Sequence, residues 1–72
     1  MGYSRKDYKL NDCFSVACIT HEPILFRGKT YDVIVYLNNV PWEEVVRKYE
    51  GIDKPDKANR IFKEMVNRYK NK

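Results

Sequence analysis

Residues 30–37 read Thr-Tyr-Asp-Val-Ile-Val-Tyr-Leu, and this stretch decides the fold that the sequence predicts. β-branched and aromatic residues dominate it, and these residues favour the extended backbone of a β-strand. Successive side chains of a strand point to opposite faces, so every second residue shares a face. The face that we expect to cover the core carries Tyr31, Val33, Val35 and Leu37.

This strand is predicted to be the second strand of a β-hairpin that spans residues 24–37. Ile24, Leu25 and Phe26 form its first strand, and Arg27, Gly28 and Lys29 form a short turn in which Gly28 is free to adopt a positive φ angle. Further upstream, residues 12–20 (DCFSVACIT) lack helical periodicity, and neither face formed by residues 13–19 of the predicted strand is charged. We therefore expect a third strand there, in the middle of the sheet.

Two helices are predicted after the strands. Residues 41–51 hold Trp42, Val45, Val46 and Tyr49 at the spacing of one apolar helical stripe. Residues 53–69 begin at Asp53, a residue type that favours the helix N-cap, and contain a second stripe. That stripe consists of Ala58, Ile61, Phe62, Met65, Val66 and Tyr69.

Strands followed by helices indicate an α+β fold. The expected architecture is a small three-stranded antiparallel sheet (β-β-β) followed by two helices packed on one face. A chain of 72 residues is one domain at most, and we assign residues 12–72 to it. Residues 1–11 contain one clear aliphatic side chain, Leu10, and are predicted to form a partly mobile N-terminal arm.

Few residues suit catalysis or metal binding. Cys13 and Cys18 would lie on opposite faces of a strand with Cα atoms ~17 Å apart, which is too far for a disulfide. Together with His21 they would also fail to supply the four ligands of a structural zinc site. A Cys–His nucleophile pair would need a substrate pocket of ~300 Å³ or more, for which a small domain has little room. We predict no catalytic residue, no metal and no cofactor.

Positive charge is concentrated at the C-terminal end. The chain has a net charge of +4, and residues 53–72 carry seven basic and three acidic side chains. Such a ridge attracts phosphates or an acidic partner, although a solvated helix face with cations near its C-terminal end is the more common explanation. Nucleic-acid binding is therefore an alternative function. The basic residues proposed to contact a partner are Lys57, Arg60, Lys63, Arg68 and Lys70.

The tyrosine content favours protein binding. Six of the ten aromatic residues are tyrosine, which is enriched at protein interfaces. Tyr3, Tyr8 and Tyr36 are therefore predicted partner-binding residues, and the expected function is a small non-enzymatic protein-interaction module. A thin core and a free sheet edge would also suit a homodimer.

In size, tyrosine content and lack of catalytic groups the chain resembles small accessory proteins of bacteriophages and mobile elements. That resemblance implies a protein that binds and regulates or inhibits a host protein. No apolar run of the sequence suits a signal peptide or a membrane span. We therefore expect a cytoplasmic protein without membrane contact.

Overall fold

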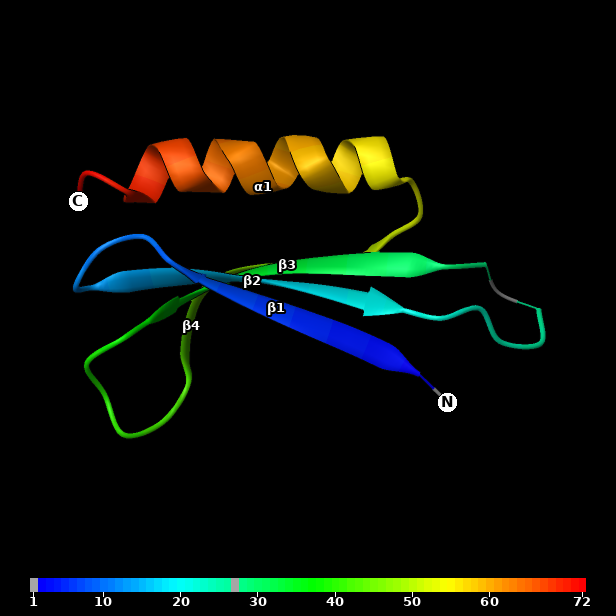
Figure 1. Cartoon of the computed structure of the whole chain (residues 1–72), viewed down its shortest axis with the longest axis horizontal. Coiled ribbons are helices and arrows are strands. Elements are labelled where there is room, and N and C mark those ends of the chain that lie inside the picture. Colours follow the sequence, from blue (N-terminus) through cyan, green and yellow to red (C-terminus); the bar gives the residue numbers. More distant parts are fainter. Residues whose placement is uncertain (1, 27) are drawn as a thin grey trace.

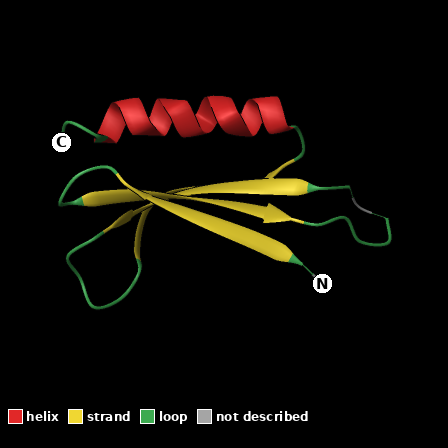
Figure 2. Ribbon diagram, in the orientation of Figure 1, coloured by secondary structure: helices red, strands yellow, loops and turns green. Residues whose placement is uncertain are grey.

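The computed structural model describes residues 2–26 and 28–72, which form an antiparallel sheet with a helix on one face (Figure 1). The strands and the helix are β1 (Tyr3–Lys9), β2 (Phe14–His21), β3 (Thr30–Leu37), β4 (Glu44–Ile52) and α1 (Pro55–Tyr69). The sheet order is β1-β2-β3-β4, so strands that are consecutive in sequence are neighbours in space. Figure 2 shows the two layers, helix and sheet, with connections at both ends of the sheet.

The prediction of three strands and two helices was wrong, although the α+β class is correct. The segment 41–51, predicted as a helix, contributes most of β4 instead. Its valines and Tyr49 favour a strand as much as they fit a helical stripe. Pairing with β3, for example Val33 opposite Tyr49, decides between the two. Hydrogen bonds to a distant strand leave no trace in the local spacing of apolar residues.

The additional strand, β1, lies within the segment predicted as an arm. It pairs with β2 without interruption, from Tyr3 opposite His21 to Lys9 opposite Ser15. Every residue of β1 is exposed, which explains why no apolar alternation marks it. A strand at the edge of a sheet is held by backbone hydrogen bonds to its single neighbour, and these require no apolar side chain.

The predicted hairpin strand at Ile24–Phe26 is also wrong. Ile24 makes an isolated bridge and Leu25 and Phe26 form a turn, so this segment belongs to the connection between β2 and β3. Arg27, part of the predicted turn, lies outside the described residues. By contrast, β3 spans the predicted residues, and β2 and α1 agree with their predictions to within two residues.

Both faces of the sheet bury apolar side chains. Between the sheet and α1 lies the main core, which contains Val16, Val33, Val35, Ile52, Met65 and Tyr69. The opposite face, called the open face below, has a smaller cluster formed by Ala17, Ile19 and Ile34. No helix in the described part of the chain has the length and apolar character to cross a membrane.

Candidate functional site

The connection between β2 and β3 carries the two most exposed large apolar side chains of the described residues, Leu25 and Phe26. Ile24, Leu25 and Phe26, named the apolar tip here, expose 63%, 88% and 94% of their surfaces. They extend beyond the end of the sheet (Figure 1). Contact with a partner would remove this surface from water, which favours association by ~25 cal/mol for each Å² of apolar area buried.

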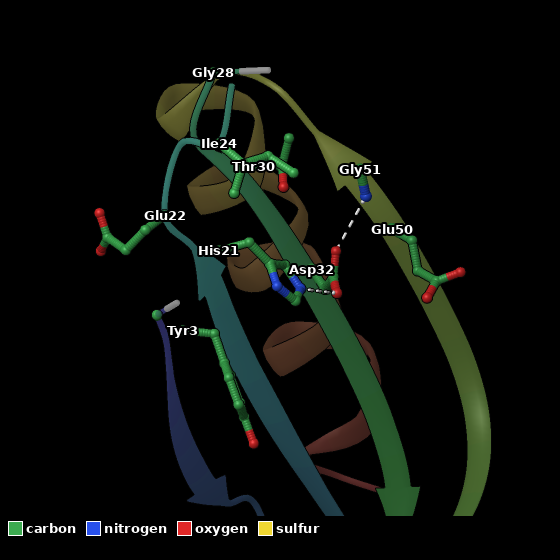
Figure 3. Close-up of a pocket in the computed structure, with 10 residues that line it drawn as sticks. Tyr3, His21, Glu22, Ile24, Gly28, Thr30, Asp32, Glu50 and Gly51 are labelled. Atoms are coloured by element: carbon green, nitrogen blue, oxygen red, sulfur yellow. Dashed lines mark hydrogen bonds and ion pairs between the residues drawn. The ribbon is translucent and has the colours of Figure 1, made fainter. Parts of the chain in front are cut away.

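An open cleft of about 620 Å³ lies beside the apolar tip. Ile24 of the tip lines it, together with Tyr3 of β1 and His21 at the end of β2 (Figure 3). Glu22 and Glu50 also line it, and Lys48 Nζ lies 3.3 Å from Glu50 Oε2, which offsets part of the negative charge. The cleft therefore combines an aromatic and apolar wall with negative charge, which suits the aliphatic stem and charged end of a basic side chain.

Asp32 is the buried polar residue of the cleft, with 8% of its surface exposed. Its Oδ2 lies 2.8 Å from His21 Nε2, and its Oδ1 accepts a hydrogen bond of 3.0 Å from the Gly51 N–H (Figure 3). Gly51 has a φ angle of 68° and lies where β4 contains an extra residue relative to β3. Asp32 thus satisfies a backbone donor that this β-bulge takes out of the ladder.

His21 is oriented by two neighbours. Its ring stacks on Tyr3 with centroids 6.0 Å apart, and its Nε2 faces Asp32. A carboxylate-held imidazole can serve as a general base when a hydroxyl or thiol lies within hydrogen-bond reach. Thr30 is opposite His21 in the sheet register. Among the hydrogen bonds of the described residues, however, none joins its hydroxyl to the ring.

The two thiols lie away from this cleft. Cys18 lies on the helix-facing side of β2, beside Phe62, and burial raises the pKa of its thiol. Cys13 is exposed in the turn between β1 and β2, and both thiols are free. Within residues 2–26 and 28–72, no group of three His, Cys, Asp or Glu side chains is positioned to hold a metal ion.

A polar network covers part of the open face. Arg5 Nη2 donates hydrogen bonds to Asp7 Oδ2 at 3.1 Å and to Glu43 Oε1 at 2.7 Å, so it ties β1 to the connection between β3 and β4. The Tyr36 hydroxyl donates to Asp7 at 2.6 Å, and the Arg5 guanidinium lies 5.7 Å from the Tyr36 ring centroid. These hydrogen bonds hold the pKa of Asp7 below its usual value, whereas burial raises that of Tyr36.

The three tyrosines predicted to contact a partner do not form one surface. Tyr3 and Tyr8 are 67% and 42% exposed, but they lie on opposite faces of β1. Tyr3 stacks beside the cleft, whereas the Tyr8 ring packs 5.1 Å from that of Phe62 in α1. Tyr36 is half-buried in the polar network. Of the three, Tyr3 therefore lies at the cleft.

The predicted basic residues all lie exposed on α1 or directly after it. They are Lys57, Arg60, Lys63, Arg68 and Lys70. Arg68 approaches Glu64 at 3.7 Å, which offsets part of its charge. None of the five lines the cleft beside the apolar tip, so the structure separates this basic surface from the cleft.

The apolar tip is a candidate functional segment that could not be recognised from the sequence. The sequence predicted Ile24, Leu25 and Phe26 as the first strand of a hairpin, because a Gly-containing turn and a long apolar strand follow them. The available signal was the length of the segment, since three residues between Pro23 and a Gly-containing turn are few for a strand. Comparisons of this chain with protein-family models, curated proteins and solved structures found no match.

Proposed function

We propose that this protein is a small non-enzymatic module that binds another protein by inserting its apolar tip into an apolar pocket of the partner. The observation that carries the proposal is the 88% and 94% exposure of Leu25 and Phe26. Full burial of a leucine or phenylalanine side chain is worth about 1.5–3 kcal/mol. Two such anchors in adjacent positions would supply the central contacts of an interface.

The cleft beside the tip adds a preference for charge. Glu22 and Glu50 line it, and Tyr3 offers an aromatic face on which a cation can rest. A partner with a lysine or arginine next to its apolar pocket would therefore match this end of the molecule. A small domain bound in this way would cover a surface of its partner, and it would regulate or inhibit the partner by blocking that surface.

The proposal is tested by covalent capture from the tip. A photo-reactive amino acid at Leu25 should cross-link one protein reproducibly, and mass spectrometry identifies it. The captured protein is then purified, and its affinity is measured by calorimetry for the unmodified chain and for the double variant Leu25→Ser, Phe26→Ser. Loss of two apolar anchors should weaken binding by about 100-fold or more.

Val46→Ser is the matched control, because Val46 is 40% exposed in β4, outside the apolar tip. This variant should bind as the unmodified chain does. Equal affinities of the unmodified chain and of the tip double variant would overturn the proposal. Circular dichroism confirms that each variant retains its sheet and helix.

Nucleic-acid binding by α1 predicts a different set of results. Affinity for DNA or RNA would fall steeply with salt and would depend on Lys57, Arg60 and Lys63 rather than on the tip. A fluorescence titration with single- and double-stranded DNA and RNA at low salt measures this directly. Tight binding abolished by Lys57→Glu, Arg60→Glu and Lys63→Glu, but unaffected by the tip variant, would replace the protein-binding proposal.

A further inference from the structure

The outer edge of β1 is open for pairing. β1 is the first strand of the sheet, so no strand of residues 2–26 and 28–72 pairs with its outer side. Seven consecutive residues, Tyr3–Lys9, keep an uninterrupted register with β2. The other edge strand, β4, contains two register irregularities, and such bulges protect a sheet edge from pairing with another chain. Of the two edges of the sheet, the β1 edge is therefore the one that is regular enough to pair with another strand.

The ladder shows which backbone groups of β1 face outward. Hydrogen bonds of 3.0 Å run from Glu22 N–H to Gly2 C=O and from Leu10 N–H to Phe14 C=O, at the two ends of the pairing. In an antiparallel ladder every second residue is hydrogen-bonded to the neighbour. Even-numbered residues of β1 thus bond to β2. The residues with outward N–H and C=O groups are Tyr3, Arg5, Asp7 and Lys9.

We infer that the partner of this edge is β1 of a second copy of the chain, paired antiparallel about Lys6. In this register Tyr3 faces the second copy's Lys9, and Arg5 faces its Asp7, so every outward backbone group finds a partner. The two Lys6 residues meet in a non-hydrogen-bonded pair on the twofold axis. The two sheets become one continuous sheet with both copies of α1 on the same face, in an isologous dimer.

Charge complementarity selects this register over its neighbours. Arg5 and Asp7 both lie in β1 and point to the open face of the sheet. The pairing about Lys6 therefore places Arg5 next to Asp7 of its own strand and opposite Asp7 of the second copy. Pairing about Arg5 would place two arginines opposite each other, and pairing about Asp7 would place two aspartates opposite each other. Like charges directly opposite in a sheet are destabilising. Lys6 of one copy faces Lys6 of the other, and the repulsion between these two like charges keeps the dimer weak.

Disulfide trapping tests the register. In a background with Cys13→Ser and Cys18→Ala, the variant Lys6→Cys should form a covalent dimer under mild oxidation. Residues of a non-hydrogen-bonded pair have Cα atoms ~4.5 Å apart, within the range that a disulfide spans. Ser4→Cys is the matched control: it lies on the same face of β1 but would face Tyr8 of the second copy. It should cross-link several-fold more slowly.

Sedimentation equilibrium tests the charge pattern without cross-linking. The unmodified chain of 8.7 kDa should approach twice that mass as its concentration rises to the millimolar range. Asp7→Arg should restore the monomer mass, whereas Glu64→Arg on α1, which changes the net charge equally, should leave the dimer intact. A monomer at all concentrations, or equal cross-linking of Lys6→Cys and Ser4→Cys, would overturn the inference. Tip variants leave β1 unchanged, so this result is independent of the protein-binding proposal.

Discussion

Asn11 joins the turn between β1 and β2 to the end of α1 through its short amide side chain. Its Nδ2 donates to the Tyr69 and Lys70 carbonyls at the end of α1, at 2.9 and 3.1 Å. Its Oδ1 accepts from the Cys13 and Phe14 N–H groups, both at 2.8 Å. The amide thus satisfies carbonyls that a helix end leaves free and holds the turn between β1 and β2.

Replacement of Asn11 should therefore lower the stability of the fold more than a surface substitution usually does. We expect Asn11→Ala to lower the free energy of unfolding by about 1–3 kcal/mol, since partly buried donors and acceptors lose their partner. Urea denaturation followed by circular dichroism measures the change. Asn59→Ala on the exposed side of α1 is the control and should change stability little. Equal effects of the two substitutions would contradict the role given to Asn11.

The Asp7 carboxylate should make stability depend on pH in acid. Hydrogen bonds from Arg5, and then from Tyr36, lower its pKa from the ordinary value of 3.8. A group whose pKa is lower in the folded state stabilises that state above its unfolded pKa, and this contribution disappears as the pH falls through the folded pKa. Relative to Asp7→Asn, the unmodified chain should therefore be more stable at neutral pH.

The advantage over Asp7→Asn should shrink below pH 3.8, the ordinary pKa of this carboxyl. The Asp7 side chain is 43% exposed, so solvent screening limits the difference to below about 1 kcal/mol. Thermal unfolding of both proteins between neutral pH and pH ~2 measures it. A stability difference that stays constant over this range would show that the ionised form of Asp7 contributes nothing.

At the scale of elements, α1 begins without a side-chain cap. The N-cap residue is Lys54, which makes no capping hydrogen bond, rather than Asp53 as the sequence suggested. Pro55 follows at the start of the helix, where its missing N–H costs nothing. Serine at the N-cap can accept a hydrogen bond from a free N–H group of the first turn.

The variant Lys54→Ser should consequently stabilise the protein. The expected gain in the free energy of unfolding is about 0.5–1 kcal/mol, visible as a higher midpoint in urea denaturation. Lys57→Ser, one turn into the helix, is the control and should lower stability slightly because serine is a poorer helix former than lysine. A loss of stability in Lys54→Ser would mean that the lysine stem makes contacts more valuable than a cap.

Elements with a buried face could be predicted from the sequence, and exposed ones could not. β3 and α1 carry apolar residues at the period of a strand and of a helix, and both were predicted nearly at their observed bounds. β1 is exposed along its whole length, and its position depends on pairing with β2. In β4 the apolar residues fit either period, because a bulge at Val46 shifts the alternation.

The same limit applies to the candidate site. The sequence showed that Ile24, Leu25 and Phe26 are apolar, but apolar residues are buried in most proteins, and their exposure depends on where the sheet ends. Asp32 lies on the strand face opposite the predicted core face, so the sequence pattern gives no sign that it is buried. Its contact with His21 depends on the pairing of β2 with β3, and its contact with the Gly51 N–H depends on the bulge in β4. Both follow from the pairing of segments that are distant in the sequence.

At the scale of the whole molecule, the main core is thin, and α1 contributes Met65 and Tyr69 to it. The helix contacts β2, β3 and β4 on a single face of the sheet. Met65, 1% exposed, is among the most deeply buried side chains between the two layers. A domain of this size has a stability of roughly 0.05–0.15 kcal/mol per residue, so the loss of one large core side chain removes much of it.

We therefore expect Met65→Ala to reduce the free energy of unfolding by about 2–5 kcal/mol, because the substitution leaves a cavity where α1 meets the sheet. The transition in urea should move to markedly lower concentration while its slope stays constant, since the surface exposed on unfolding is nearly unchanged. Lys63→Ala, on the solvent side of the same helix, is the control and should leave the midpoint within about 0.5 kcal/mol of the original. Equal midpoints for Met65→Ala and Lys63→Ala would mean that the sheet, with its second cluster at Ala17, Ile19 and Ile34, holds together without the helix.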